Sequence, residues 1–201
     1  MTYANNAVKS ILLMAYVLGS QTVSVAQEQS FPLKGTIELA GTIAYANYTL
    51  VYQGQKGDAT SLFSFSPQVG YFVTENFEVG LSSGVVLLPG LSFQSSGENS
   101  TTGLQLFATP AYHFSSGGSN LTPFIEAQLG YTSLASSSGL SDVKRSGFSY
   151  GGRGGVKFVP VEHLILTFAV QYLSINLKAS GELERTGYNY FTIGVGVGAY
   201  F

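Results

Sequence analysis

The sequence predicts an all-β protein, an eight-stranded antiparallel up-and-down transmembrane β-barrel. Bulky apolar residues alternate with small or polar residues along eight segments, and this is the period of a β-strand. Most of the segments are also long enough to cross a bilayer on a tilt, which takes about 9–11 residues. Charged residues make up 10% of the 201 residues, whereas a typical soluble protein has about 25%. We therefore expect one domain whose outer wall is not in contact with water.

The N-terminal residues have the features of a cleaved secretory signal. An apolar run at residues 11–19 follows Lys9 and precedes the small-x-small site Ser24–Ala26. An N-terminal anchor helix is the alternative, but the run is much shorter than the roughly 20 residues that a spanning helix needs. The expected division is a signal peptide at residues 1–26, a short periplasmic segment at residues 27–35 and the barrel domain at residues 36–201.

Composition limits the chemistry and the partners. The chain has no cysteine, which excludes disulfides and thiolate metal sites. Its net charge of −2 gives no indication of a nucleic-acid partner. An exported chain without cysteine and without a helical span indicates a bacterial cell envelope, and the barrel pattern indicates the outer membrane. We expect no cofactor.

Turn-rich stretches separate the alternating segments. In chain order, the strands are expected near residues 36–52, 60–73, 77–93, 102–114, 121–134, 147–159, 164–178 and 188–201. The short connections are at residues 74–76, 115–120 and 160–163, and the mostly longer ones are at residues 53–59, 94–101, 135–146 and 179–187. With both termini in the periplasm, the short turns are periplasmic and the long loops extracellular. An even number of strands closes the sheet and removes its edges.

The bulky residues of each segment are assigned to the lipid face. In chain order these are Ile37, Leu39, Ile43, Tyr45; Phe63, Phe65, Val69, Tyr71; Val79, Leu81, Val85, Leu87; Leu104, Leu106, Tyr112, Phe114; Ile125, Ala127, Leu129, Tyr131; Phe148, Tyr150, Val156, Phe158; and Leu166, Phe168, Val170, Tyr172. Aromatic residues fall mainly near the segment ends, as interfacial girdles require. Two features disturb the pattern. In the seventh segment Leu173, Ile175 and Leu177 change the parity, which predicts a β-bulge near Tyr172. Four prolines inside the segments fit only strand ends or bulges, namely Pro67, Pro89, Pro110 and Pro123.

The opposite face of the segments is small or polar. It includes Ser66, Gln68, Gly70, Gly80, Ser82, Gly84, Gln105, Thr109, Gln128 and Gly130. In the last segment the bulky face carries Phe191, Ile193, Val195, Val197 and Ala199, and the other face carries Gly194, Gly196 and Gly198. A soluble lipocalin-like barrel has the same period. The small face, however, fits the narrow lumen of eight strands, and the other face is too uniformly apolar for water. We expect the glycine face to be crowded by side chains of the first and seventh strands.

Three hairpins and the terminus of the chain resemble a known family. Residues 68–80 (QVGYFVTENFEVG) are similar to the periplasmic hairpin of small outer-membrane β-barrel proteins. Residues 155–164 resemble a second copy of this hairpin, and residues 112–117 with residues 121–131 resemble a third. The terminal Ala199–Phe201 is similar to the aromatic signal that such proteins present to the barrel-assembly machinery. The resemblance implies an eight-stranded outer-membrane barrel, with the lipid bilayer and lipopolysaccharide as its surroundings. It does not define a role, because OmpA-, OmpX- and OmpW-like barrels and lipid A-modifying enzymes share this architecture.

Five charged residues fall on the predicted lumen face: Glu38, Glu78, Glu126, Arg153 and Lys157. Glu126 and Arg153 are expected to pair across adjacent strands, and Lys157 is expected to lie lower, near Glu78 and Glu38. Charges inside a barrel need partners or water. The favoured interpretation is a network that packs and fills the lumen, and the alternative is a gated path for ions.

Other polar residues give weaker indications. His113 and Ser115 resemble the His-x-Ser pair of outer-membrane lipid A deacylases, in which histidine activates the serine. The predicted topology, however, places His113 at the periplasmic end and on the lumen side, whereas those enzymes act on the outer leaflet. Glu162 and His163 lie in a periplasmic turn, with no spacing typical of a metal site. The glycines of residues 151–155 lack the features of a phosphate loop and are expected to allow close packing in the wall.

The sequence therefore predicts a non-enzymatic protein with a structural or surface-interaction role. A surface role would use the extracellular loops, whose charges are Asp58, Glu98, Asp142, Lys144, Arg145, Glu182, Glu184 and Arg185. One alternative is a narrow channel for small or hydrophobic solutes, and a second is a lipid A-modifying enzyme.

Overall fold

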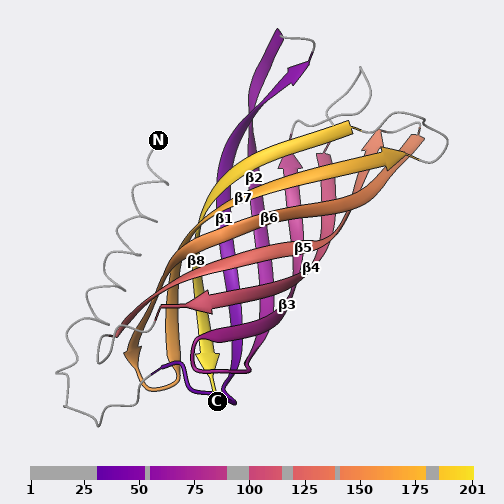
Figure 1. Ribbon diagram of the computed structural model, residues 1–201. Helices are drawn as coiled ribbons and strands as arrows, with labels where there is room; N and C mark the ends of the chain where they lie inside the picture. Colours follow the sequence, from indigo (N-terminus) through magenta and orange to yellow (C-terminus); the bar gives the residue numbers. More distant parts are fainter. Residues whose placement is uncertain (1–30, 53–54, 90–99, 115–119, 139–140, 180–185) are drawn as a thin grey trace, which may run out of the picture.

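Eight antiparallel strands form a closed barrel in the part of the chain that the structure describes (Figure 1). The computed structural model describes residues 31–52, 55–89, 100–114, 120–138, 141–179 and 186–201. The strands are β1 (Ile37–Tyr52), β2 (Gln55–Phe72), β3 (Phe77–Pro89), β4 (Ser100–His113), β5 (Leu121–Ser138), β6 (Ser141–Val161), β7 (Leu164–Ala179) and β8 (Thr186–Tyr200). Each strand pairs with its neighbours in the sequence, and β1 pairs with β8 to close the sheet. The predicted fold class and strand number are confirmed. No helix in the described residues is long and apolar enough to cross a membrane.

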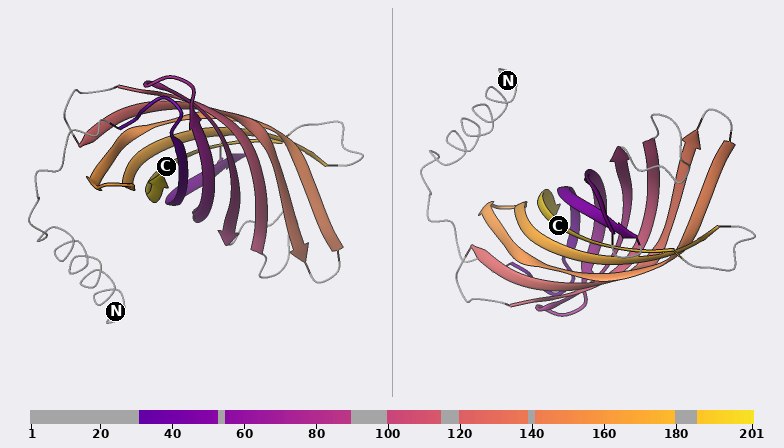
Figure 2. Two further views of the ribbon diagram at one scale, coloured as in Figure 1. Left: turned by 90° about the horizontal axis from the view of Figure 1, so that it is seen from below. Right: turned by 90° about the horizontal axis from the view of Figure 1, so that it is seen from above.

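The orientation of the side chains follows the predicted alternation. Bulky residues such as Leu104, Leu106 and Ile193 are exposed on the outside, whereas Gln68, Gln105 and Gln128 are buried inside. The chain end at Phe201 lies at the bottom of Figure 1. There the backbones of Ile37 and Phe201 exchange two hydrogen bonds, and the short turn at residues 73–77 lies at the same end. Figure 2 shows from below and above how strongly the strands tilt and coil.

Two predicted loops are mostly strand in the structure. Residues 53–59 belong largely to β2, which begins at Gln55, and residues 135–146 extend β5 to Ser138 and start β6 at Ser141. The β5–β6 ladder continues to the Ser138–Ser141 pair. The extension could not be predicted from the sequence, because both faces of the hairpin are polar there and the alternation in hydrophobicity ends. Pairing of the backbones does not require apolar side chains and continues beyond that point.

The predicted bulge at Tyr172 is wrong. Tyr172 and Leu173 pair in an unbroken register with Gly152 and Gly151 on β6, and with Phe191 and Tyr190 on β8. The alternation of β7 is therefore kept, and Leu173, Ile175 and Leu177 are buried inside the barrel. Register shifts occur instead between Thr49 and Val51 in β1, and between Phe158 and Val161 in β6.

The expectation for the prolines holds at two positions of four. Pro89 ends β3 and Pro123 is the third residue of β5, but Pro67 and Pro110 lie further inside their strands. The β4–β5 register is the same on both sides of Pro110, and the β2–β3 register is the same on both sides of Pro67. A proline lacks one N–H group, so it removes one hydrogen bond, and the ladder continues on either side without a bulge.

The glycine face of β8 is crowded as the sequence predicts. A Cβ atom built on Gly194 would lie 3.1 Å from Thr42 Cγ2, and one on Gly196 would lie 3.4 Å from Thr167 Cβ. A Cβ atom on Gly198 would lie 3.0 Å from Ala40 Cβ. The contacts come from β1 and β7, the two neighbours of β8, which confirms the prediction.

Candidate functional site

The lumen contains an ionic layer near the end of the barrel at which β1 begins and β8 ends, the end that the sequence predicts to be periplasmic. Lys157 Nζ donates hydrogen bonds to Glu38 Oε2 at 2.6 Å and to Glu78 Oε2 at 3.3 Å. All three side chains are almost completely buried. Because β6, β1 and β3 are not adjacent in the sheet, these ion pairs cross the lumen. Lys157 thus joins three separate parts of the wall.

A second ion pair lies next to this layer, between adjacent strands. Glu126 and Arg153 are register partners on β5 and β6, and Arg153 Nη2 donates to Glu126 Oε2 at 2.7 Å. Gln68 accepts a hydrogen bond from Arg153 at 2.6 Å and donates one to Glu126 at 3.0 Å. Gln128 donates to the other oxygen of Glu126 at 2.9 Å. The structure therefore brings together the five predicted lumen charges in the two groups that the sequence suggests.

His113 is a member of the ionic layer, whereas from the sequence it was placed on the lumen side at a strand end but not included among the lumen charges. Its Nε2 donates to Glu78 Oε2 at 2.8 Å, and both side chains are fully buried. The ring stacks on Phe124 at a centroid distance of 5.9 Å and contacts Phe72 at 4.8 Å. Its lumen-side parity was the signal that could have placed it in the network. Ser115 lies outside the described residues.

Aromatic rings cover the ionic layer from the periplasmic end. Phe31 precedes β1 and contacts Phe72 at a centroid distance of 5.5 Å, Tyr200 at 4.8 Å and His113 at 6.5 Å. Within the layer, the Lys157 ammonium lies 5.9 Å from the Phe72 ring and 5.3 Å from the Phe124 ring. Such ring faces attract cations. The last part of the predicted periplasmic segment, residues 31–35, thus packs against the barrel, and the predicted signal peptide lies outside the described residues.

Gly70 leaves the space that the Glu78 side chain occupies. Gly70 on β2 faces Gly80 on β3, and a Cβ atom on Gly70 would overlap the Glu78 carboxylate. The Glu78 side chain therefore fits into the space that Gly70 leaves, and its carboxylate is bonded there by Lys157 and His113.

A polar layer lies above the ionic one and encloses a small cavity. The cavity has a volume of about 20 Å³, which is room for about one water molecule. Its lining is mostly hydroxyl and amide groups, together with Arg153: Thr42, Ala44, Ser64, Ser66, Gln68, Ser82, Gln105, Phe107, Gln128, Arg153, Gln171 and Tyr190.

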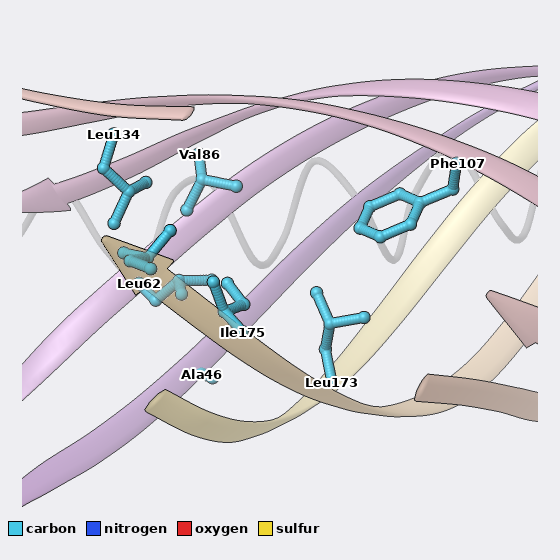
Figure 3. Packing of buried hydrophobic residues seen from close by; sticks show 8 residues of the cluster. Ala46, Leu62, Val86, Phe107, Leu134, Leu173 and Ile175 are labelled. Atoms are coloured by element: carbon cyan, nitrogen blue, oxygen red, sulfur yellow. The ribbon is translucent and has the colours of Figure 1, made fainter. Parts of the chain in front are cut away.

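An apolar layer fills the opposite part of the lumen, which the sequence predicts to be extracellular. Leu62, Leu173 and Leu177 are completely or almost completely buried there. The cluster consists of Ala46, Leu62, Val86, Phe107, Leu134, Leu173, Ile175 and Leu177, with Tyr190 packed against it. Figure 3 shows these side chains meeting from several strands. This layer was not predicted, because its β7 members were assigned to a bulge.

The remaining predicted positions form no further site in the described residues. His163 Nε2 lies 3.4 Å from Glu162 Oε1, and His163 Nδ1 donates to the Tyr200 carbonyl at 2.7 Å. No group of three metal-ligating side chains occurs in the part of the chain that the structure describes. Gly151 and Gly155 allow close packing as expected, because a Cβ atom on either would overlap the backbone of β7. Phe201 is exposed at the end of β8.

Only two of the eight predicted loop charges have described side chains. Lys144 is exposed and Arg145 is partly buried. The others fall on residues whose side chains lie outside the description, namely Asp58, Glu98, Asp142, Glu182, Glu184 and Arg185.

Comparison with known proteins identifies both a family and a fold. The outer membrane protein beta-barrel domain family matches residues 11–201. Neisserial surface protein A has a TM-score of 0.63 and 16% identity, and the match covers 84% of this chain and 100% of that one. OprG from Pseudomonas aeruginosa has a TM-score of 0.58 and 18% identity, with coverages of 84% and 97%. Ail, the attachment invasion locus protein of Yersinia pestis, has a TM-score of 0.51 and 14% identity, with coverages of 84% and 100%. No curated protein matches significantly.

Proposed function

The chain belongs to the outer-membrane β-barrel protein family, and on this premise we propose that it is a closed, non-enzymatic barrel that holds an extracellular surface for contact with a partner. The protein resides in the bacterial outer membrane, with its exposed apolar wall in the lipid bilayer. We propose that lipopolysaccharide is among the lipids that contact this wall. We also propose that the barrel-assembly machinery recognises the terminal strand, which ends near Phe201.

The observation that carries this proposal is the filling of the lumen by three successive layers. Ion pairs and aromatic rings fill the periplasmic end, polar side chains fill the middle and the apolar cluster fills the extracellular end. A cavity of about 20 Å³ between them is far smaller than the roughly 300–1,000 Å³ of a typical ligand pocket. A barrel of this kind is suited to act through its surface.

The extended hairpins support a surface role. The β1–β2 ladder continues to the Tyr52–Gln55 pair, and the β5–β6 ladder continues to the Ser138–Ser141 pair. In Figure 1 the β1–β2 hairpin rises above the rest of the barrel. Among the proteins of similar fold, Ail is an attachment invasion locus protein by name. Functional residues on barrels commonly lie in such projecting segments.

The alternative of a narrow channel is tested by conductance of the purified protein in planar bilayers. We expect neither the wild type nor Arg153→Ala to conduct, because the apolar layer lies above Arg153 and does not depend on it. A porin measured in the same bilayers is the control for insertion. Stepwise conductance of the wild type would refute the closed barrel.

The surface role is tested on whole cells that display the protein. One variant replaces residues 135–144, which lie between the register partners Leu134 and Arg145, by a two-residue Asn-Gly turn that preserves the β5–β6 hairpin. We expect this variant to fold and insert like the wild type but to lose adhesion of the cells to host-cell or matrix surfaces. Equal adhesion of cells with the wild type, the variant and no protein would refute an adhesive surface on this hairpin.

A further inference from the structure

Two exposed lysines lie on the lipid-facing side of the barrel near its extracellular end. Lys178 on β7 belongs to the outward-facing set of that strand, and Lys144 belongs to the outward-facing set of β6. Lys178 is the register partner of Ser146, and Lys144 lies two residues from Ser146 on the same face. Diagonal neighbours of this kind are about 7–8 Å apart. Two flexible ammonium groups at this spacing can reach one phosphate group.

The level of the two lysines relative to the membrane follows from the aromatic residues below them. Tyr131 and Phe148 are register partners and half-exposed on the outer wall, and the Tyr131 hydroxyl donates to Ser146 Oγ at 2.8 Å. Aromatic side chains of this kind mark the boundary between hydrocarbon and headgroups. Lys144 lies four residues beyond Phe148 along β6, about 13 Å along the strand. The ammonium groups therefore reach the level of the lipid headgroups.

The described charged side chains on this part of the wall are of one sign. Among the side chains that the structure describes on the outer face of the extracellular half, none is acidic. The exposed acids of the described residues, Glu75 and Glu162, lie in the periplasmic turns at the opposite end. Lysine above an aromatic belt stabilises contact with an anionic headgroup while its methylene stem stays on the apolar wall.

We propose that Lys144 and Lys178 form a binding site for the phosphate of an outer-leaflet glycolipid, with Ser146 and Tyr131 at its base. The acyl chains of the lipid would lie against the wall below, over Phe148 and Tyr150. The inference rests on the proposed contact with lipopolysaccharide, but it does not require the lumen to be closed.

The test compares two lipids and three variants of the full mature chain. Binding of bisphosphorylated lipid A, and of the same lipid after removal of its phosphates, is measured by native mass spectrometry in detergent micelles. The double variant Lys144→Gln/Lys178→Gln is expected to bind the phosphorylated lipid about tenfold more weakly than the wild type. The variant Lys144→Arg/Lys178→Arg is expected to keep the binding, and Lys34→Gln, which removes one positive charge at the periplasmic end, is the control for a general charge effect.

Each outcome has a defined meaning, provided that heat-modifiable gel mobility shows every variant to be folded. A loss confined to the phosphorylated lipid and to the double glutamine variant supports the site. Equal binding of both lipids to the wild type would overturn the phosphate site while leaving lipid contact intact. Failure of the wild type to bind either lipid would refute the proposed lipopolysaccharide contact as well. A similar loss in Lys34→Gln would show a general charge effect and overturn the site.

Discussion

Lys157 Nζ lies 2.6 Å from Glu38 Oε2, and this buried ion pair connects β6 to β1 across the lumen. The same ammonium also bonds Glu78 of β3, whose carboxylate accepts a hydrogen bond from His113 of β4. One lysine thereby links four strands, of which only β3 and β4 are neighbours in the sheet. The barrel interior thus contributes to holding the wall together as well as to closing the lumen.

Removal of this lysine is expected to destabilise the barrel strongly. In Lys157→Ala, Glu38 and Glu78 lose their common partner while they remain buried. Breaking a buried pair in this way costs about 3–5 kcal/mol. Urea unfolding in lipid vesicles, followed by gel mobility and circular dichroism, measures the change. The exposed Lys34→Ala is the control, and an equal unfolding midpoint in both variants would show that the ionic layer does not stabilise the fold.

Gly70→Ala is expected to destabilise the barrel by about 1–3 kcal/mol, because the new methyl group occupies the position of the Glu78 carboxylate. Gly154→Ala is the matched control. Its Cβ atom would lie 3.6 Å from the nearest heavy atom, the Phe124 carbonyl oxygen, which is an ordinary contact. The difference in the free energy of unfolding between the two variants is the measurement. If Gly154→Ala were the more destabilising of the two, the packing argument for Gly70 would fail.

Leu173→Ala is expected to cost about 2–5 kcal/mol, because it leaves a cavity in the apolar layer. Leu104→Ala removes the same atoms from the outer wall, where lipid fills the space, so its cost is expected to be smaller. Unfolding in lipid vesicles compares the two variants. An equal or larger cost for Leu104→Ala would argue against tight packing of the extracellular end of the lumen.

We expect the purified protein to release no fatty acid from lipopolysaccharide. His113 is fully buried at the periplasmic end and its Nε2 is held by Glu78, so it is far from the outer leaflet. Release of fatty acid is measured by mass spectrometry, with a known lipid A deacylase as the positive control. Release by the wild type that His113→Ala abolishes would show an enzyme and refute the non-enzymatic role.

Local alternation allowed the fold to be predicted almost completely. Successive side chains of a strand point to opposite faces, so the alternation of bulky and small residues determines which ones face lipid. The positions of Glu38, Glu78 and Lys157 on the lumen side were predicted from this alternation. The Glu126–Arg153 pair was also predicted, because the two residues lie on consecutive strands and the connection between such strands restricts their register. Strand ends were less well predicted where polar hairpins extend beyond the apolar belt, as in β5 and β6.

The sequence by itself determined that this protein is a barrel of eight strands with an apolar outer wall and charged residues inside, because these properties depend on a period of two along the chain. Only the tertiary structure decided how the lumen side chains bond to one another and which side chains fill the end opposite the ionic layer. The burial of Leu173, Ile175 and Leu177 in an apolar layer, and the hydrogen bond from Arg153 of β6 to Gln68 of β2, depend on closure of the sheet and on the stagger between distant strands. Contacts across a closed barrel join residues far apart in the chain, and no local pattern encodes them.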